Sequence, residues 1–170
     1  MLKMIFRKTM TFILIAPAVI WTHLISLFFG KEKAAKFCGP YFTLATKPFA
    51  RFLAPHINCA ADFDRISSGM QKKIWLWNLF FDFSISENTS NTFRLLITYC
   101  PIHDMMKSLG FSELTRFVCD ADWEIANENE DKWFFNREHQ LAKGDAFCDH
   151  TYLRKCCSTE EMQPNRCTRG

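Results

Sequence analysis

Cysteine, histidine and aspartate side chains are concentrated in residues 100–154 of the 170-residue chain. This stretch holds three cysteines, three histidines and several aspartates. Thiols and imidazoles are side chains that commonly act as nucleophile and base, and both bind metal ions. Core packing alone does not account for such a density, so we expect a functional site in this part of the chain.

Cys148 is the strongest candidate for a nucleophile, because Asp149 and His150 follow it directly. Alternate side chains of a strand point to opposite faces, so His150 returns to the face of Cys148 while Asp149 points away. A carboxylate beside a thiol would raise the pKa of that thiol, whereas an imidazole can take its proton. We therefore predict a catalytic pair of Cys148 and His150, with His139 placed to reach it across a hairpin.

Further polar and thiol groups are expected around this pair. Asp122 is predicted to be catalytic, and Arg137 either binds a substrate carboxylate with both arms of its guanidinium or pairs with Asp122. Cys100 and Cys119 are predicted to bind substrate and to converge on Cys148. That convergence would allow an activated thiol or a divalent metal ion held by thiolates. Each cysteine could equally be a small core residue, since free cysteine is among the most buried residue types.

Two strand pairs and the helices between them must position these side chains. Thr92–Tyr99 alternates apolar and polar residues and follows the turn-forming run Ser86–Asn91, so we expect a hairpin that begins near Lys73. The alternative is a helix over residues 67–79 that leads into a shorter first strand. The other expected elements are a helix over 102–109 closed by Gly110, a helix ending near Asn127, and strands over 132–141 and 146–154 joined by Lys143-Gly144-Asp145. The predicted fold class is α+β: an antiparallel sheet with helices on one face, preceded by an apolar N-terminal helix.

The chain is expected to divide into three parts: an apolar helix over residues 1–30, an α+β body over 31–155, and a flexible tail over 156–170. At the start of the body, Cys38-Gly39-Pro40 is a typical helix stop, which predicts one helix before it and a second helix after it.

Residues 11–29 form a run of nineteen residues without a charge, which is just long enough to span a hydrocarbon core of about 30 Å. A buried core helix and a signal peptide are the alternatives, although residues 26–30 make a poor cleavage site. Lysine and arginine flank the run on both sides, with the larger number on the far side. We expect a membrane-associated protein whose body lies in the cytoplasm.

Charge is distributed unevenly along the chain. Residues 1–60 carry eight Lys or Arg and one acid, a net charge of +7, whereas residues 61–170 carry a net charge of −4. An acidic body argues against nucleic acid as a partner, and a basic front end fits an anionic membrane surface. The eight cysteines include no C-x-x-C pair, so we expect reduced thiols rather than a zinc knuckle or a disulfide framework.

Several short motifs carry a resemblance to a known family. They are Cys-Pro at the end of a strand (Cys100-Pro101), Gly110 at the end of the next helix, Cys-x-x-Asp (Cys119 to Asp122), and Arg-x-x-Gln-Leu-Ala-x-Gly-Asp-x-x-Cys-Asp (Arg137 to Asp149). Over about residues 93–154 the chain resembles the L-2-amino-thiazoline-4-carboxylic acid hydrolase family. It departs from the family pattern at His139, where a threonine is expected, and at His150, where an aromatic residue usually stands.

The resemblance implies a small-molecule substrate and the hydrolytic opening of a cyclic thiazoline to give N-carbamoyl-L-cysteine. Opening such a ring requires attack on the C=N carbon, a proton for the nitrogen and release of the sulfur. An activated thiol could attack directly, or a divalent metal ion could activate water. The alternative function is a non-catalytic sensor domain at the membrane, which would bind a metal ion or a hydrophobic ligand in a pocket lined by phenylalanine and tryptophan.

Overall fold

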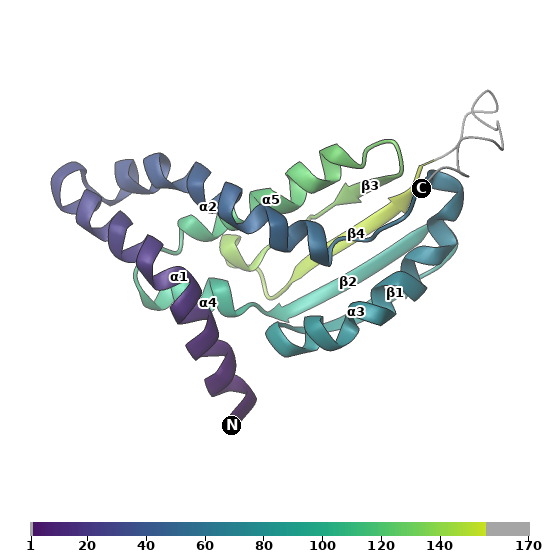
Figure 1. Ribbon diagram of the computed structural model, residues 1–170, viewed down its shortest axis with the longest axis horizontal. Coiled ribbons are helices and arrows are strands. Elements are labelled where there is room, and N and C mark those ends of the chain that lie inside the picture. Colours follow the sequence, from purple (N-terminus) through teal and green to yellow (C-terminus); the bar gives the residue numbers. More distant parts are fainter. Residues whose placement is uncertain (1, 156–170) are drawn as a thin grey trace.

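The computed structural model describes residues 2–155, and these form five α-helices, two short 3-10 helices and one four-stranded antiparallel sheet (Figure 1). The elements in chain order are α1 (Leu2–Phe29), α2 (Lys31–Leu53), η1 (Ala60–Arg65), α3 (Ile66–Phe80), β1 (Asp82–Asn88), β2 (Thr92–Tyr99), α4 (Pro101–Ser108), α5 (Leu114–Glu128), β3 (Trp133–Asn136), η2 (Leu141–Lys143) and β4 (Cys148–Arg154). The predicted α+β class with an apolar N-terminal helix is confirmed. The predicted tail over 156–170 lies outside the described residues.

The sheet has the strand order β1-β2-β4-β3, and each neighbouring pair is antiparallel. The alternation in β2 is explained by burial, because Phe93, Leu95 and Ile97 are buried on one face. Side chains of α2, α3 and α5 pack against these three residues in one core cluster. The helices therefore cover one face of the sheet, as predicted.

The hairpin predicted from Lys73 onwards forms in part. Its first half is helix α3, and β1 begins only at Asp82, so the alternative of a helix leading into a shorter strand is correct. Ile66, Met70 and Trp77 are buried at helical spacing along α3. Burial of this stripe outweighs the β propensity of the residues around Trp77.

Helix α2 is continuous through Gly39, Pro40 and Pro48, so the predicted break after Phe37 is wrong. The glycine serves helix packing instead of helix termination: a Cβ atom on Gly39 would lie 2.5 Å from the ring of Phe117 in α5. A second contact follows one turn later, where the Thr43 hydroxyl donates to the Phe117 carbonyl at 2.7 Å. The contacts at Gly39 and Thr43 hold α2 close to α5, and these two helices cover the sheet.

The last predicted strand pair is also shorter than expected. Strand β3 ends at Asn136, and residues 137–147 form a loop that contains η2. The cause is a set of carboxylates that take backbone hydrogen bonds from the loop: Asp149 accepts from the amides of Glu138 and His139, and Asp145 accepts from the amide of Gln140. The bonds to Asp149 hold the loop beside β4 through a side chain, in place of a longer strand ladder. Gly144 does form the expected turn, with φ of +95°.

Helix α1 packs against α2 and α4 through a second core cluster that includes Val19. Near its N-terminus the buried Arg7 donates to the carbonyls of Asn78, Leu79 and Phe81 and to the Asp82 carboxylate, at 2.7–2.9 Å. These contacts tie α1 to the end of α3 and the start of β1. The helix is long and apolar enough to cross a membrane, a property that core helices and signal sequences share.

Candidate functional site

A cavity of about 80 Å³ lies between the sheet and the helices that cover it. By volume it holds roughly three waters at the density of the liquid. One part of its wall is apolar and includes Phe49, Trp77, Phe81, Ile97 and Trp133. Thr46 of α2 adds a hydroxyl to its wall, and the other polar and thiol groups come from the residue after β2, from α5 and from β4: Cys100, Cys119, Asp122, Cys148, His150 and Tyr152. Aromatic walls with a few convergent polar groups are typical of small-molecule sites.

Strand register explains why β4 contributes three residues to this cavity. Cys148 lies opposite Ile97 and His150 lies opposite Leu95 on the neighbouring strand β2. Because the partners on β2 face the helices, the thiol and the imidazole face them too, as the parity argument predicts. Tyr152 continues the same face. Tyr152 was not among the predicted site residues, although its position two residues after His150 places it on the same face of the strand.

Burial dominates the chemistry of the three thiols. It raises the pKa of Cys148, although the Leu141 amide, which donates to its sulfur at 3.2 Å, and the nearby Arg137 work in the opposite direction. Burial likewise raises the pKa of Cys100 to about 12 and the pKa of Cys119 further still. All three cysteines are free and carry their protons at neutral pH. The contact between the Leu141 amide and Cys148 could not be predicted from the sequence, because every residue other than proline has a backbone N–H donor.

The redox prediction holds for these three cysteines and not for the whole chain. Cys38 is also free, whereas Cys59 is disulfide-bonded. The expectation of fully reduced thiols is therefore wrong at Cys59, which does not line the cavity.

His150 lies in an aromatic enclosure next to one carboxylate. Its ring meets Trp77 and Phe135 edge-on, at centroid distances of 6.3 and 5.4 Å. Its Nε2 atom is 3.8 Å from a carboxylate oxygen of Asp122. Burial lowers the pKa of His150 to about 4. The imidazole is therefore neutral at pH 7 and free to accept a proton.

The lowered pKa of His150 predicts an acid-sensitive fold. Between its ordinary pKa of 6.5 and its folded value of about 4, the unfolded chain binds a proton that the folded chain does not, so acidification favours unfolding. This one group should lower the free energy of unfolding by about 2 kcal/mol between pH 7 and pH 5. Urea unfolding of wild type and His150→Gln at both pH values checks this. The variant should lose less stability on acidification; equal losses in the two proteins would contradict the assignment.

Arg137 is buried beside the cavity and does not line it. Its guanidinium donates to the Asp122 carboxylate at 2.8 Å and to the Cys119 carbonyl at 2.9 Å. The cation also lies over the rings of Trp123 and Phe135. Of the two alternatives that the sequence left open for Arg137, the pair with Asp122 is present.

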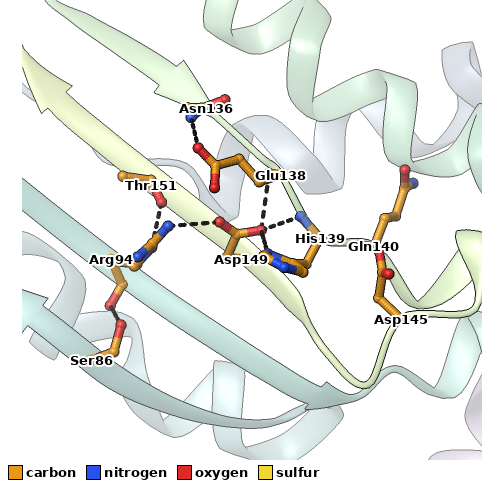
Figure 2. Close-up of polar contacts among 9 residues, drawn as sticks. All are labelled: Ser86, Arg94, Asn136, Glu138, His139, Gln140, Asp145, Asp149 and Thr151. Atoms are coloured by element: carbon orange, nitrogen blue, oxygen red, sulfur yellow. Dashed lines mark hydrogen bonds and ion pairs between the residues drawn. The ribbon is translucent and has the colours of Figure 1, made fainter.

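His139 lies on the other side of the sheet, with Asp149, and is not among the residues that line the cavity (Figure 2). Asp149 is fully buried there. One of its oxygens accepts the amides of Glu138 and His139 at 3.0 and 2.6 Å, and the other accepts from Arg94 at 3.0 Å. Burial would raise the pKa of Asp149, but the hydrogen bonds and Arg94 outweigh it and lower that pKa. This carboxylate fixes the loop that carries Arg137 and the Leu141 amide.

One group of possible metal ligands occurs among residues 2–155: Glu138, His139 and Asp149, whose donor atoms lie within 4.8 Å of one another. Both oxygens of Asp149 already accept hydrogen bonds, and one of them faces a guanidinium. A cation would have to compete with Arg94 for that oxygen, so the arrangement suits loop anchoring better than metal binding. The three cysteines do not form such a group within the described part of the chain.

Comparison with known proteins agrees with the motifs. No curated protein matches the chain. The sequence model of the L-2-amino-thiazoline-4-carboxylic acid hydrolases matches residues 8–152. The match is wider than the region of the motifs, since it includes most of α1 and ends within β4. The chain therefore belongs to the L-2-amino-thiazoline-4-carboxylic acid hydrolase family.

Proposed function

We propose that the protein is a hydrolase that opens a 2-amino-thiazoline ring in the cavity beneath α2 and α5. The observation that carries this proposal is the meeting of one hydrogen-bonded thiol (Cys148), one neutral imidazole (His150) and one carboxylate (Asp122) around a space of about 80 Å³. Family membership supplies the substrate class. The apolar walls exclude water around the reacting groups and strengthen their electrostatic interactions.

Cys148 acts as the nucleophile in this proposal. Its sulfur bonds to the ring carbon that lies between nitrogen and sulfur, and the thiol proton passes through His150 to the ring nitrogen. Collapse of the tetrahedral adduct re-forms the C=N bond and breaks the bond from that carbon to the ring sulfur, and His150 carries the proton from the nitrogen to the departing thiolate. An imidazolium with a pKa of about 4 is a strong enough acid to do this promptly. The open product remains joined to Cys148.

Water completes the reaction. It attacks the same carbon and gives a proton to His150, after which Cys148 leaves and recovers that proton. The net change is addition of one water and cleavage of one C–S bond, which yields a urea with a free thiol, N-carbamoyl-L-cysteine. The neighbouring Asp122 carboxylate stabilises each transient imidazolium, because it lies 3.8 Å from the ring nitrogen.

The other predicted residues receive supporting roles. Arg137 holds Asp122 and the end of the loop in place through its two hydrogen bonds. Cys100 and Cys119 form part of the wall against which the ring packs. His139 takes no part in the chemistry, and its amide anchors the loop to Asp149.

The test is direct, because the product carries a thiol that the substrate lacks. The full-length protein is incubated with L-2-amino-thiazoline-4-carboxylate, and thiol release is followed with a colorimetric reagent while the product mass is recorded. We expect release that scales with enzyme concentration and an increase in mass of one water. A protein that is folded by circular dichroism but releases no thiol and leaves the substrate mass unchanged would refute the proposed reaction.

A further inference from the structure

Helix α1 presents an uncharged apolar surface to solvent along most of its length. Large side chains cover its outer face, among them Ile13, Leu14, Ile20, Trp21, Leu27 and Phe28, which are 58–83% exposed. A surface of this size and composition marks an interaction site in a folded protein. The partner has to be apolar over the length of a long helix.

The opposite face of α1 is docked on the body near both ends. Arg7 is buried against the end of α3, and Lys8 pairs with Asp104 of α4 at 3.2 Å. Towards the other end, Val19 packs on α2 and α4, and His23 meets the ring of Phe111 edge-on at 5.9 Å. From Arg7 to His23 the helix extends about 24 Å, so most of it lies along the body.

This docking disfavours a spanning orientation. Figure 1 shows α1 and α2 as two arms that meet at one end, with α2 leading back over the sheet. Ala35 and Cys38 of α2 pack in the same cluster as Val19. If residues 11–29 crossed the membrane, Lys33 and Lys36 of α2 would be carried towards the hydrocarbon, which is unfavourable. The alternative would be to detach α1 and leave Arg7 without its four acceptors.

Charge indicates which apolar partner fits. Besides Lys8, which faces the body, exposed lysines occur near both ends of α1: Lys3 at one end, and Lys31, Lys33 and Lys36 at the other. Two of them have acidic partners, Asp82 for Lys3 and Glu32 for Lys36. Residues 1–60 carry a net charge of +7. A second copy of the chain placed on this face would bring these like charges together, whereas an anionic leaflet attracts them. The surface therefore matches a lipid bilayer better than itself.

We propose that α1 lies in the plane of an anionic membrane surface, with its outer apolar face inserted and its inner face still docked on the body. Helices of this kind sit with the apolar face about 5–10 Å into the boundary between headgroups and acyl chains. The body is then bound peripherally to the leaflet through α1 and is not attached by a transmembrane helix. This inference does not depend on the reaction proposed above.

Trp21 provides a depth gauge, because it stands near the middle of residues 11–29. Full-length protein is mixed with vesicles of phosphatidylcholine, with or without phosphatidylserine, whose acyl chains carry bromine near the headgroup or near the bilayer centre. The Trp21→Phe variant supplies the fluorescence of the other four tryptophans, which is subtracted. In-plane seating predicts stronger quenching by the shallow bromine and tighter binding to the anionic vesicles. Stronger quenching by the deep bromine means that α1 spans the bilayer, and the proposal fails.

Variants separate insertion from other causes of vesicle binding. Leu14→Glu, on the outer face of α1, should lower partitioning at least about tenfold. Phe134→Glu replaces a comparably exposed residue on β3 and should leave partitioning unchanged. Equal effects of the two substitutions, self-association of the full chain without vesicle binding, or a mature protein that lacks α1 would each overturn the proposal.

Discussion

Replacing Cys148 with serine should lower the rate of ring opening by roughly 10³-fold or more while the fold stays intact. The loss is expected because a hydroxyl is a far weaker nucleophile than a thiol in this buried site. The two side chains have nearly the same shape, so the core should repack little. Thiol release from L-2-amino-thiazoline-4-carboxylate measures kcat and KM, and urea unfolding measures stability.

Cys119→Ser is the matched control for this experiment. Cys119 lines the same cavity as Cys148 and also has a raised pKa, although it is only partly buried; it has no role as nucleophile in the proposal. Its substitution should change KM more than kcat. Near-normal turnover by Cys148→Ser would make the thiol structural and would leave attack by water as the route. In that case Asp122 and His150 would act as the base.

Asp149→Ala should be the most destabilising substitution on the far face of the sheet, with a cost of about 2–4 kcal/mol in the free energy of unfolding. It removes the acceptor of two loop amides and the partner of Arg94. Because Arg94 is one-third exposed, water would relieve part of the cost. Asp149→Asn keeps one acceptor oxygen and should cost less.

Urea unfolding of these variants and of Asp145→Ala tests the assignment, since the Asp145 carboxylate accepts one loop amide, that of Gln140. The carboxylate of Asp149 has a folded pKa below its ordinary value of 3.8. Its stabilisation is therefore complete above pH 3.8 and is lost as the pH falls through the folded pKa. An Asp149→Ala protein that is as stable as wild type would show that the loop is held by other contacts.

Period-two alternation was the most reliable guide to the fold. It placed β2 and the two faces of β4 correctly, because burial on one face of a sheet imposes that period on the sequence. Local propensity was less reliable. The stretch after Lys73 contains many β-formers, yet it is helical up to Phe80 because Met70 and Trp77 bury a helical stripe. Likewise, Gly39 followed by Pro40 predicts the end of a helix, but the glycine allows close contact with Phe117, a residue distant in sequence that a local pattern does not include.

The candidate site was partly accessible from the sequence. Cys100, Cys119 and Cys148 were expected to converge, and all three line one cavity. The position of His139 could not be predicted from the sequence. It depends on a loop whose shape is set by hydrogen bonds to the buried carboxylate of Asp149, and Asp149 follows Glu138 by eleven residues. The neutral state of His150 follows from its aromatic enclosure, which is formed by residues from α3 and β3 that are distant along the chain.

Strand β4 has consequences for how this sequence can change over time. Its even-numbered residues supply the thiol, imidazole and phenol of the cavity, and Asp149 and Thr151 serve the opposite face. Deleting or inserting one residue early in it would reverse every side chain beyond that point, turning the imidazole outwards and a residue of the far face into the apolar core. Pairing with β2 on one side and β3 on the other blocks such a slip. We therefore expect β4 to tolerate substitutions at single positions better than insertions or deletions.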